Sequence, residues 1–341
     1  MPINGNTFLY YLRRMMQISD KLYPSKQLFI AWIKLIRLPN IIILAAIIIL
    51  LHIGVYLPVY NAVNIESPVG GWIFVFFVLS LCLIAAGGNV INDYFDYRID
   101  LINKPKKIVI KKEISFQNAM TGYQVLTIAG IVGGFLVGWL LGILKIGFFF
   151  GFGALLLYGY SESFKRKLLI GNLMIAFLGF LSILMLWVIE FFALRNNPGS
   201  FVNVYPSFLK INLIIGGYAL FAFLTTLIRE IIKDVEDVEG DRANGCHTLP
   251  ISTSLQTTRM VLTGLIILTI FLLIPCQILC WENNMKVLAF FITPGIQLQL
   301  VLLLIRLFKA ESKIDYHTVS TSMKWIMVAG ILGIQLINIH V

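Results

Sequence analysis

Nine apolar stretches of about 20 residues each constrain this chain more than any other feature of its sequence. A helix needs about 20 residues to cross the ~30 Å hydrocarbon layer of a membrane. Only 13% of the 341 residues are charged and 58% are hydrophobic, whereas about 25% of the residues of soluble domains are charged. The sequence therefore predicts an all-α polytopic membrane protein, a bundle of about nine transmembrane helices. The stretches centre near Ala45, Val78, Ile131, Leu155, Leu181, Leu220, Leu268, Val301 and Ile331, and the fourth is short.

The distribution of Lys and Arg predicts the topology. With nine spans, the N-terminal arm and four alternate loops lie on one side, and 23 of the 27 Lys and Arg residues fall there. The positive-inside rule makes this side cytoplasmic. We expect a multi-pass protein of a plasma or inner membrane. Residues 1–38 would form a cytoplasmic amphipathic arm, and residues 39–341 the nine-helix transmembrane domain.

The net charge of +10 follows mainly from this topology, with some attraction to anionic membrane lipid as an extra. No soluble basic domain is predicted that could hold nucleic acid, so we expect no nucleic-acid partner. The sequence gives no indication of the oligomeric state.

Two acidic motifs with one shared spacing follow the second and the sixth apolar stretch, both on the predicted cytoplasmic side. At 100° per residue, the offsets 0, 3 and 7 place three side chains within about a 60° arc of an α-helix. Each motif is therefore predicted to form one acidic stripe on one helix. Like charges this close repel each other, and the arrangement persists only where something cationic compensates it. The aspartates of the two motifs are Asp93, Asp96, Asp100, Asp234, Asp237 and Asp241.

The side-chain oxygens of these stripes are suitable ligands for Mg²⁺, which in turn binds phosphate oxygens. One Mg²⁺ ion takes only one or two protein carboxylates, so six carboxylates together with Asn92 and Glu230 match two or more ions. Such ions neutralise a diphosphate and stabilise it as a leaving group. We expect the stripes to face each other across a central cavity that is open to the cytoplasmic side. Aromatic residues of the spans would line a channel for an isoprenoid chain.

Acidic stripes also occur in proteins without a diphosphate site, in two settings. A solvated acidic face on a loop helix accounts for one stripe, but not for two with identical offsets on the same side of the membrane. A cation transporter would place ionisable residues near the bilayer midplane. The middles of the spans are almost free of charge, and the exception, Glu190, lies near the outer end of the fifth.

The two motifs resemble the aspartate-rich motifs of the UbiA superfamily of intramembrane prenyltransferases. They are GNVINDYFDYRIDLINKP at Gly88–Pro105 and IREIIKDVEDVEGDRANGCHTLP at Ile228–Pro250. The resemblance extends to RLPN at Arg37–Asn40 and to GN at 171–172, and it covers nearly the whole chain. It implies Mg²⁺-dependent transfer of a prenyl group from a prenyl diphosphate to an acceptor at the cytoplasmic face. One departure is the run 106–108 (KKI), where many members have a residue followed by RP.

Carried onto this sequence, the resemblance implies two metal sites and a set of substrate contacts. One Mg²⁺ ion would bind to Asn92, Asp96 and Asp100, with support from Asp93. The other would bind to Asp234, Asp237 and Asp241. Contacts with the diphosphate or the acceptor are expected from Arg37, Asn40, Lys104, Lys165, Arg229 and Lys233. Asn89, one helical turn before Asp93, extends the first stripe and is added to this set.

The acceptor is less well defined by the sequence. The run REIIKDVEDVEGD with TLP after it is most similar to archaeal-type enzymes that add a second geranylgeranyl chain to geranylgeranylglyceryl phosphate. Such a lipid-like acceptor brings its own phosphate, for which Arg229, Lys233 and the loop Lys165–Lys167 are candidates. The alternative is an aromatic acceptor, as in quinone or haem biosynthesis, in which a ring carbon attacks.

Overall fold

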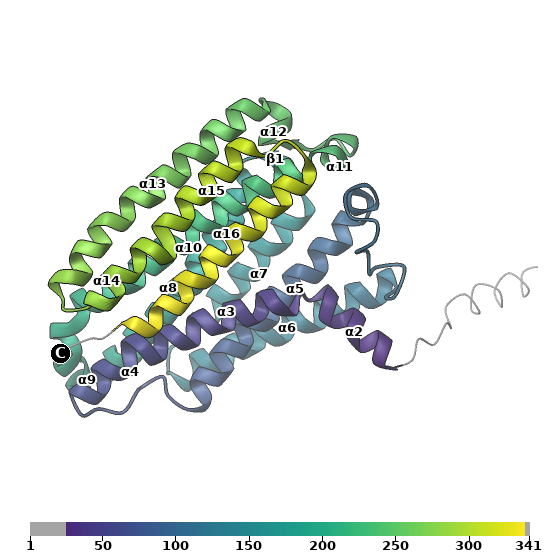
Figure 1. Ribbon diagram of the computed structural model, residues 1–341. Coiled ribbons are helices and arrows are strands. Elements are labelled where there is room, and N and C mark those ends of the chain that lie inside the picture. Colours follow the sequence, from purple (N-terminus) through teal and green to yellow (C-terminus); the bar gives the residue numbers. More distant parts are fainter. Residues whose placement is uncertain (1–24, 338–341) are drawn as a thin grey trace, which may run out of the picture.

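The computed structural model describes residues 25–337, and in this part of the chain nine apolar helical segments form one bundle (Figure 1). Eight of the segments are long and apolar enough to cross a membrane. The ninth, α7 (Ile146–Glu162), has 17 residues and so a length of about 26 Å. The prediction of an all-α membrane bundle with about nine helices, the fourth of them short, is confirmed. Of the predicted N-terminal arm, residues 1–24 lie outside the described residues.

The other elements are helices, apart from two short strands that pair two loops far apart in sequence. The helices are α2 (Ser25–Leu35), α3 (Leu38–Leu51), α4 (Leu57–Ala62), α5 (Trp72–Asn103), α6 (Phe116–Leu140), α8 (Ile170–Arg195), α9 (Pro198–Val204), α10 (Phe208–Glu236), α11 (Val238–Ala243), α12 (Leu249–Ser252), α13 (Leu255–Glu282), α14 (Lys286–Ile292), α15 (Leu298–Lys309) and α16 (Lys313–Gly333). The strands β1 (Lys167–Leu168) and β2 (His247–Thr248) pair in parallel.

Prolines account for two irregular segments within the spans. The π-helical turn His52–Tyr56 joins α3 to α4, whose second residue is Pro58. The π-helical turn Thr293–Gln297 contains Pro294 and joins α14 to α15. Proline has no N–H group, and its ring collides with the carbonyl group four residues earlier, so the helical ladder widens at these points.

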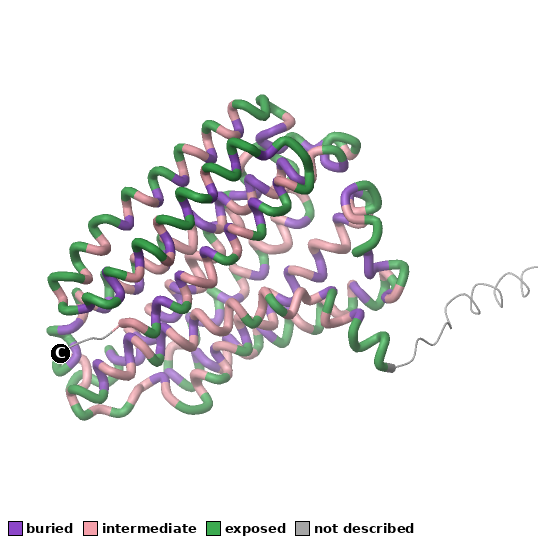
Figure 2. The backbone as a smooth tube through the Cα atoms, viewed as in Figure 1, coloured by how far each residue is buried: buried purple, intermediate pink, exposed green. Residues whose placement is uncertain are grey.

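Small residues allow α5 and α6 to pack closely. A Cβ atom on Gly87 would lie 2.5 Å from Oγ1 of Thr127, and one on Gly130 would lie 2.6 Å from Cγ1 of Ile84. Lipid is as apolar as these side chains, so close van der Waals packing is a main source of helix association in membranes. Buried segments lie between the helices and exposed ones face outward (Figure 2).

The two acidic motifs lie at the same end of the bundle. The C-terminal end of α5 and the region that follows α10 are located there, beside α11, α12 and β1 (Figure 1). A direct contact joins them: Nδ2 of Asn103, the last residue of α5, donates a hydrogen bond of 2.8 Å to the carbonyl oxygen of Asp237. The fold thus brings together segments more than 130 residues apart in sequence.

Candidate active site

A polar cavity of about 710 Å³, here called the carboxylate cavity, lies between the two acidic motifs. All the predicted carboxylates line it: Asp93, Asp96, Asp100, Asp234, Asp237 and Asp241. So do Asn92 and six of the seven predicted substrate contacts, namely Arg37, Asn40, Lys104, Lys165, Arg229 and Lys233. Asn89 does not line this cavity, and its Nδ2 donates a 2.8 Å hydrogen bond to the carbonyl oxygen of Ile36.

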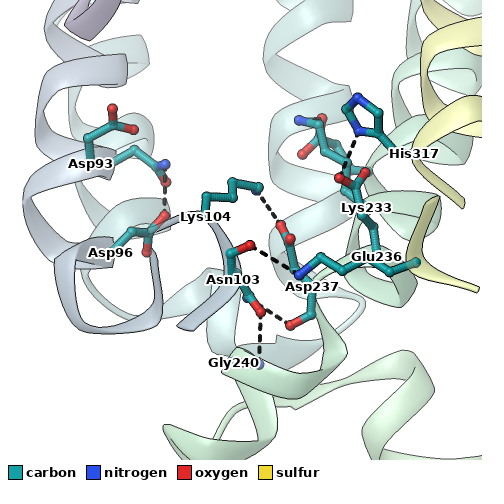
Figure 3. Close-up of polar contacts among 12 residues, drawn as sticks. Asp93, Asp96, Asn103, Lys104, Lys233, Glu236, Asp237, Gly240 and His317 are labelled. Carbon is teal, nitrogen blue, oxygen red and sulfur yellow. Dashed lines mark hydrogen bonds and ion pairs between the residues drawn. The ribbon is translucent and has the colours of Figure 1, made fainter. Parts of the chain in front are cut away.

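The second motif is not carried by one continuous helix. Its helix α10 ends at Glu236, Asp237 follows with φ −100° and ψ 8°, and Asp241 lies on the separate helix α11. The prediction of one acidic stripe per helix holds for α5 but is wrong for the second motif. The cause is Asn103, whose Nδ2 donates to the Asp237 carbonyl while its Oδ1 accepts 2.9 Å from the Gly240 N–H (Figure 3). A side chain inserted in this way interrupts the helical ladder.

Arg37 reaches the first motif from the turn between α2 and α3. Its Nη2 lies 2.5 Å from Oδ1 of Asp93, and the negative charge of Asp93 raises the pKa of the guanidinium although burial opposes this. The backbone of Arg37 is left-handed, with φ 54° and ψ 53°, which costs a residue with a Cβ roughly 1–2 kcal/mol. Strain of this kind is typical of functional sites, where the surroundings hold a side chain in place.

Two lysines contact one acidic motif each. Lys165 forms an ion pair with Asp96 and lies 3.4 Å from Oδ1 of Asn92. Nζ of Lys104 lies 2.5 Å from Oδ2 of Asp237 (Figure 3). Burial lowers the pKa of Lys104, but the charge of Asp237 and its hydrogen bond together raise the pKa by more. The lysine therefore remains a cation between the two motifs.

The second motif has further polar partners. Nδ2 of Asn172 donates a 2.8 Å hydrogen bond to Oδ2 of Asp234. Glu230, one turn earlier on α10, accepts from Lys233 at 2.6 Å and from Arg229 at 3.1 Å. The sequence indicated Asn172 only as part of the GN pair at 171–172 and Glu230 only as an oxygen ligand for a metal ion. Neither of these contacts was predicted from it.

Asp241 differs from an ordinary aspartate in its proton affinity. Burial raises its pKa, Lys165 opposes the rise and the charge of Asp237 adds to it, so that the pKa is about 7. The backbone around it is fixed, because the Cys246 N–H donates 2.9 Å to the carbonyl oxygen of Asp241. This carboxylate changes its charge near neutral pH.

The cavity offers oxygen donors that fit magnesium. Within residues 25–337 no three His, Cys, Asp or Glu side chains are grouped closely enough to hold a metal ion, and cations lie between the carboxylates instead. However, Oδ1 of Asp96 and Oδ1 of Asp237 are buried and have no hydrogen-bond partner among the described residues. An unpaired buried carboxylate oxygen is unfavourable, and a hard cation such as Mg²⁺ prefers this ligand type.

An apolar cavity of about 280 Å³ lies deeper between α3, α5, α7 and α8, and its walls also include Thr226 of α10. Asn40 lines this cavity and the carboxylate cavity, so the two adjoin. Asn89 lines the apolar cavity together with aliphatic side chains and the aromatic rings of Phe149, Phe150 and Phe152. Such a lining suits a hydrocarbon chain.

Comparison with known proteins identifies the family. The sequence profile of the UbiA prenyltransferase family matches residues 55–326. The chain belongs to this family. A digeranylgeranylglyceryl phosphate synthase of Methanobrevibacter smithii is 34% identical to this UbiA member over 237 residues, which are 70% of this chain and 74% of the relative. The chain is thus a multi-pass membrane prenyltransferase, as its sequence predicts.

Solved structures agree with this fold. A structure described as providing insights into digeranylgeranylglyceryl phosphate synthase in membranes is 24% identical and has a TM-score of 0.57 over 90% of this chain and 97% of its own. A UbiA homologue from Archaeoglobus fulgidus, bound to GPP and Mg²⁺, is 15% identical and has a TM-score of 0.54 over 89% of this chain and 99% of its own. At these identities the likeness concerns the fold alone.

Proposed function

We propose that this UbiA member transfers a geranylgeranyl group from geranylgeranyl diphosphate to the free hydroxyl of geranylgeranylglyceryl phosphate. The observation that carries the proposal is the convergence of both acidic motifs and their cationic partners on one cavity that adjoins an apolar one. The acceptor is suggested by the synthase of Methanobrevibacter smithii, which is 34% identical. The aromatic alternative has no comparable support.

Two or more Mg²⁺ ions would be held by the oxygen donors of the two motifs. Asn92, Asp96 and Asp100, with Asp93 beside them, would hold one ion. Asp234, Asp237 and Asp241 would hold the other. The buried, unpartnered oxygens of Asp96 and Asp237 support these assignments. Bound Mg²⁺ supplies Lewis-acid stabilisation of the diphosphate as a leaving group.

The cations of the carboxylate cavity would bind the donor's diphosphate. Arg37, Lys104 and Lys165 each contact one aspartate of the motifs. When the charge of these aspartates is compensated by metal, the three side chains can turn to phosphate oxygens. A guanidinium binds such oxygens in pairs and an ammonium binds them as a point charge.

The chemical step would be a substitution at C1 of the prenyl group. A bond forms between the acceptor's hydroxyl oxygen and C1, and the bond between C1 and the diphosphate oxygen breaks. The electron pair leaves with the diphosphate, and the hydroxyl proton passes to water or to the released diphosphate. The donor's hydrocarbon chain would lie in the apolar cavity, with Asn40 and Asn89 in its wall.

The cytoplasmic orientation of the site is part of the proposal. The two acidic motifs lie at one end of the bundle (Figure 1). The segments assigned to that side carry 23 of the 27 Lys and Arg residues, as the positive-inside rule requires of a cytoplasmic face.

The test is a transfer assay with purified protein in lipid vesicles. Labelled geranylgeranyl diphosphate is supplied with geranylgeranylglyceryl phosphate or with a hydroxybenzoate, in buffered Mg²⁺ or in chelator. We expect label in the phosphate-bearing lipid, and only when Mg²⁺ is present. Label in the aromatic product only would overturn the proposed acceptor, and equal transfer in chelator would overturn the metal requirement.

A further inference from the structure

A second polar cavity of about 670 Å³, here called the cationic cavity, lies on the opposite side of α3 from the apolar cavity. Ile41 and Leu44 of α3 face the apolar cavity, whereas Ile42 and Ile43 face the cationic one. The first turns of α3 therefore separate the two cavities. The cationic cavity is lined by helix α16, which contributes no residue to the carboxylate cavity.

The cationic cavity adjoins the carboxylate cavity but differs from it in charge. Lys104, Arg229 and Lys233 line both. The cationic cavity contains five Lys or Arg side chains, and its only acidic lining residue among the described ones is Glu236. That carboxylate is engaged by Nδ1 of His317 at 2.9 Å (Figure 3). Three of these cations are paired with carboxylates of the carboxylate cavity, Lys104 with Asp237, and Arg229 and Lys233 with Glu230. Lys107 and Lys324 form no ion pair within the described residues, so the cationic cavity favours an anionic ligand and not a metal ion.

Lys324 of α16 is a cation without an acidic partner. Its Nζ lies 3.3 Å from the amide oxygen Oδ1 of Asn40, and within residues 25–337 no carboxylate forms an ion pair with it. Arg229 lines the same cavity, and although its Nη1 pairs with Glu230 at 3.1 Å, its Nε is buried without a hydrogen-bond partner among the described residues. An unpaired cation such as Lys324 is unfavourable in a membrane helix and indicates a ligand site.

The shape of the cationic cavity suits a lipid with an anionic headgroup. Lys324 lies one helical turn after Ser320 and Thr321, whose hydroxyls line the same face of α16. The neighbouring wall is apolar and faces outward, since Trp325 is 68% exposed and Ile42 is 57% exposed. In a transmembrane bundle, such outward faces contact the lipid chains. A polar head would thus lie at Lys324 while its chain lies along Ile42 and Trp325.

We infer that the cationic cavity binds the phosphate monoester headgroup of the prenyl acceptor, through Lys324 and Arg229. Donor and acceptor chains would then lie on opposite sides of α3, and their reactive ends would meet where Lys104, Arg229 and Lys233 line both polar cavities. The inference rests on the proposed function for the identity of the acceptor. It adds no chemical step, because the residues only bind and orient the headgroup.

The test uses Trp325 as a probe of binding and needs no turnover. Full-length protein in vesicles is titrated with geranylgeranylglyceryl phosphate without donor, and the change in tryptophan fluorescence is recorded. We expect saturable binding in the wild type, and no fluorescence change in Trp325→Phe, which lacks the probe. In Lys324→Met binding should be about tenfold to a hundredfold weaker, the usual effect of losing a charge-assisted hydrogen bond. Lys324→Arg should restore most of the affinity. Lys309→Met, at an exposed position outside all three cavities, is the matched control.

A phosphate-free acceptor separates the headgroup from the chain. Geranylgeranylglycerol should bind equally weakly to the wild type and to Lys324→Met. Equal affinity of these two proteins for the phosphate-bearing lipid would overturn the inference. If Lys324-dependent binding is found but no prenyl transfer to this lipid occurs, the proposed function fails and the anion site remains. If transfer occurs and Lys324→Met leaves the KM for the acceptor unchanged, the anion site fails and the function remains.

Discussion

At the scale of single residues, aspartates of both acidic motifs in the carboxylate cavity form ion pairs with cationic side chains. Arg37 contacts Asp93, and two lysines from other segments contact Asp96 and Asp237. This pairing explains how six carboxylates can line one cavity without a prohibitive repulsion. It also implies exchange: an entering Mg²⁺ ion must displace a lysine, and the displaced lysine is then available to a phosphate oxygen. We therefore expect Mg²⁺ and the diphosphate to bind cooperatively.

Asp241 predicts how the metal requirement depends on pH. Its pKa is raised from 3.8 to about 7, chiefly by burial, so the side chain is protonated below pH 7 and charged above it. A proton competes with Mg²⁺ for the carboxylate. The Mg²⁺ concentration that gives half-maximal transfer should therefore increase as the pH falls from 8 to 6. Equal half-saturating concentrations at these two pH values would contradict the assignment of Asp241 as a ligand.

At the scale of elements, Asn103 connects the end of α5 to the interruption between α10 and α11. In Asn103→Ala the Gly240 N–H loses its partner, the Asp237 carbonyl keeps only the Asp241 N–H at 3.2 Å, and one link between α11 and α5 is lost. Because α11 carries Asp241, we expect about a tenfold increase in the half-saturating Mg²⁺ concentration, as is usual when an outer contact of a metal ligand is removed.

The control for this change is Asn283→Ala. Asn283 follows α13 and its Nδ2 donates only to the carbonyl oxygen of Leu279, an exposed contact. It should leave the Mg²⁺ dependence unaltered. An Asn103→Ala enzyme with the wild-type Mg²⁺ dependence would show that the contact between α5 and α11 does not position the second motif.

A buried carboxylate joins the first span to α8 far from the cavity. Glu190 is fully buried, with Nδ1 of His52 at 2.7 Å and the hydroxyl of Tyr60 donating at 2.6 Å. It lies 18 residues along α8 from Asn172, or roughly 27 Å. Glu190→Ala should lower the free energy of unfolding in detergent by about 1–2 kcal/mol, typical of hydrogen bonds between membrane helices. KM for the donor should not change.

Thermal denaturation with a matched carboxylate variant checks this expectation. Glu282 ends α13 at an exposed position, and Glu282→Gln should leave the melting temperature unchanged. If Glu190→Ala melts like the wild type, the contact does not stabilise the bundle. If instead it alters KM for the donor, Glu190 affects the site in a way that the fold does not explain.

At the scale of the whole molecule, local periodicity predicted the features that depend on one segment. The nine apolar helices and the stripe on α5 follow from residue spacing alone, because a helix fixes the direction of each side chain. The interruption after α10 could not be predicted, since it depends on Asn103, 134 positions away. The same holds for Asn89, whose side chain turns to the backbone of Ile36 across 53 residues. Long-range contacts decide such details, and one sequence does not specify them locally.

The central claim is that both acidic motifs act together in one Mg²⁺-dependent transfer. It is tested most directly by the initial rate of prenyl transfer across a chelator-buffered Mg²⁺ titration, for the wild type, Asp96→Asn and Asp237→Asn, with folding checked by circular dichroism and gel filtration. We predict that each variant remains folded and that its rate falls by at least about a hundredfold, the scale of losing an electrostatic contact to the leaving group. A wild-type rate in either folded variant would contradict the claim.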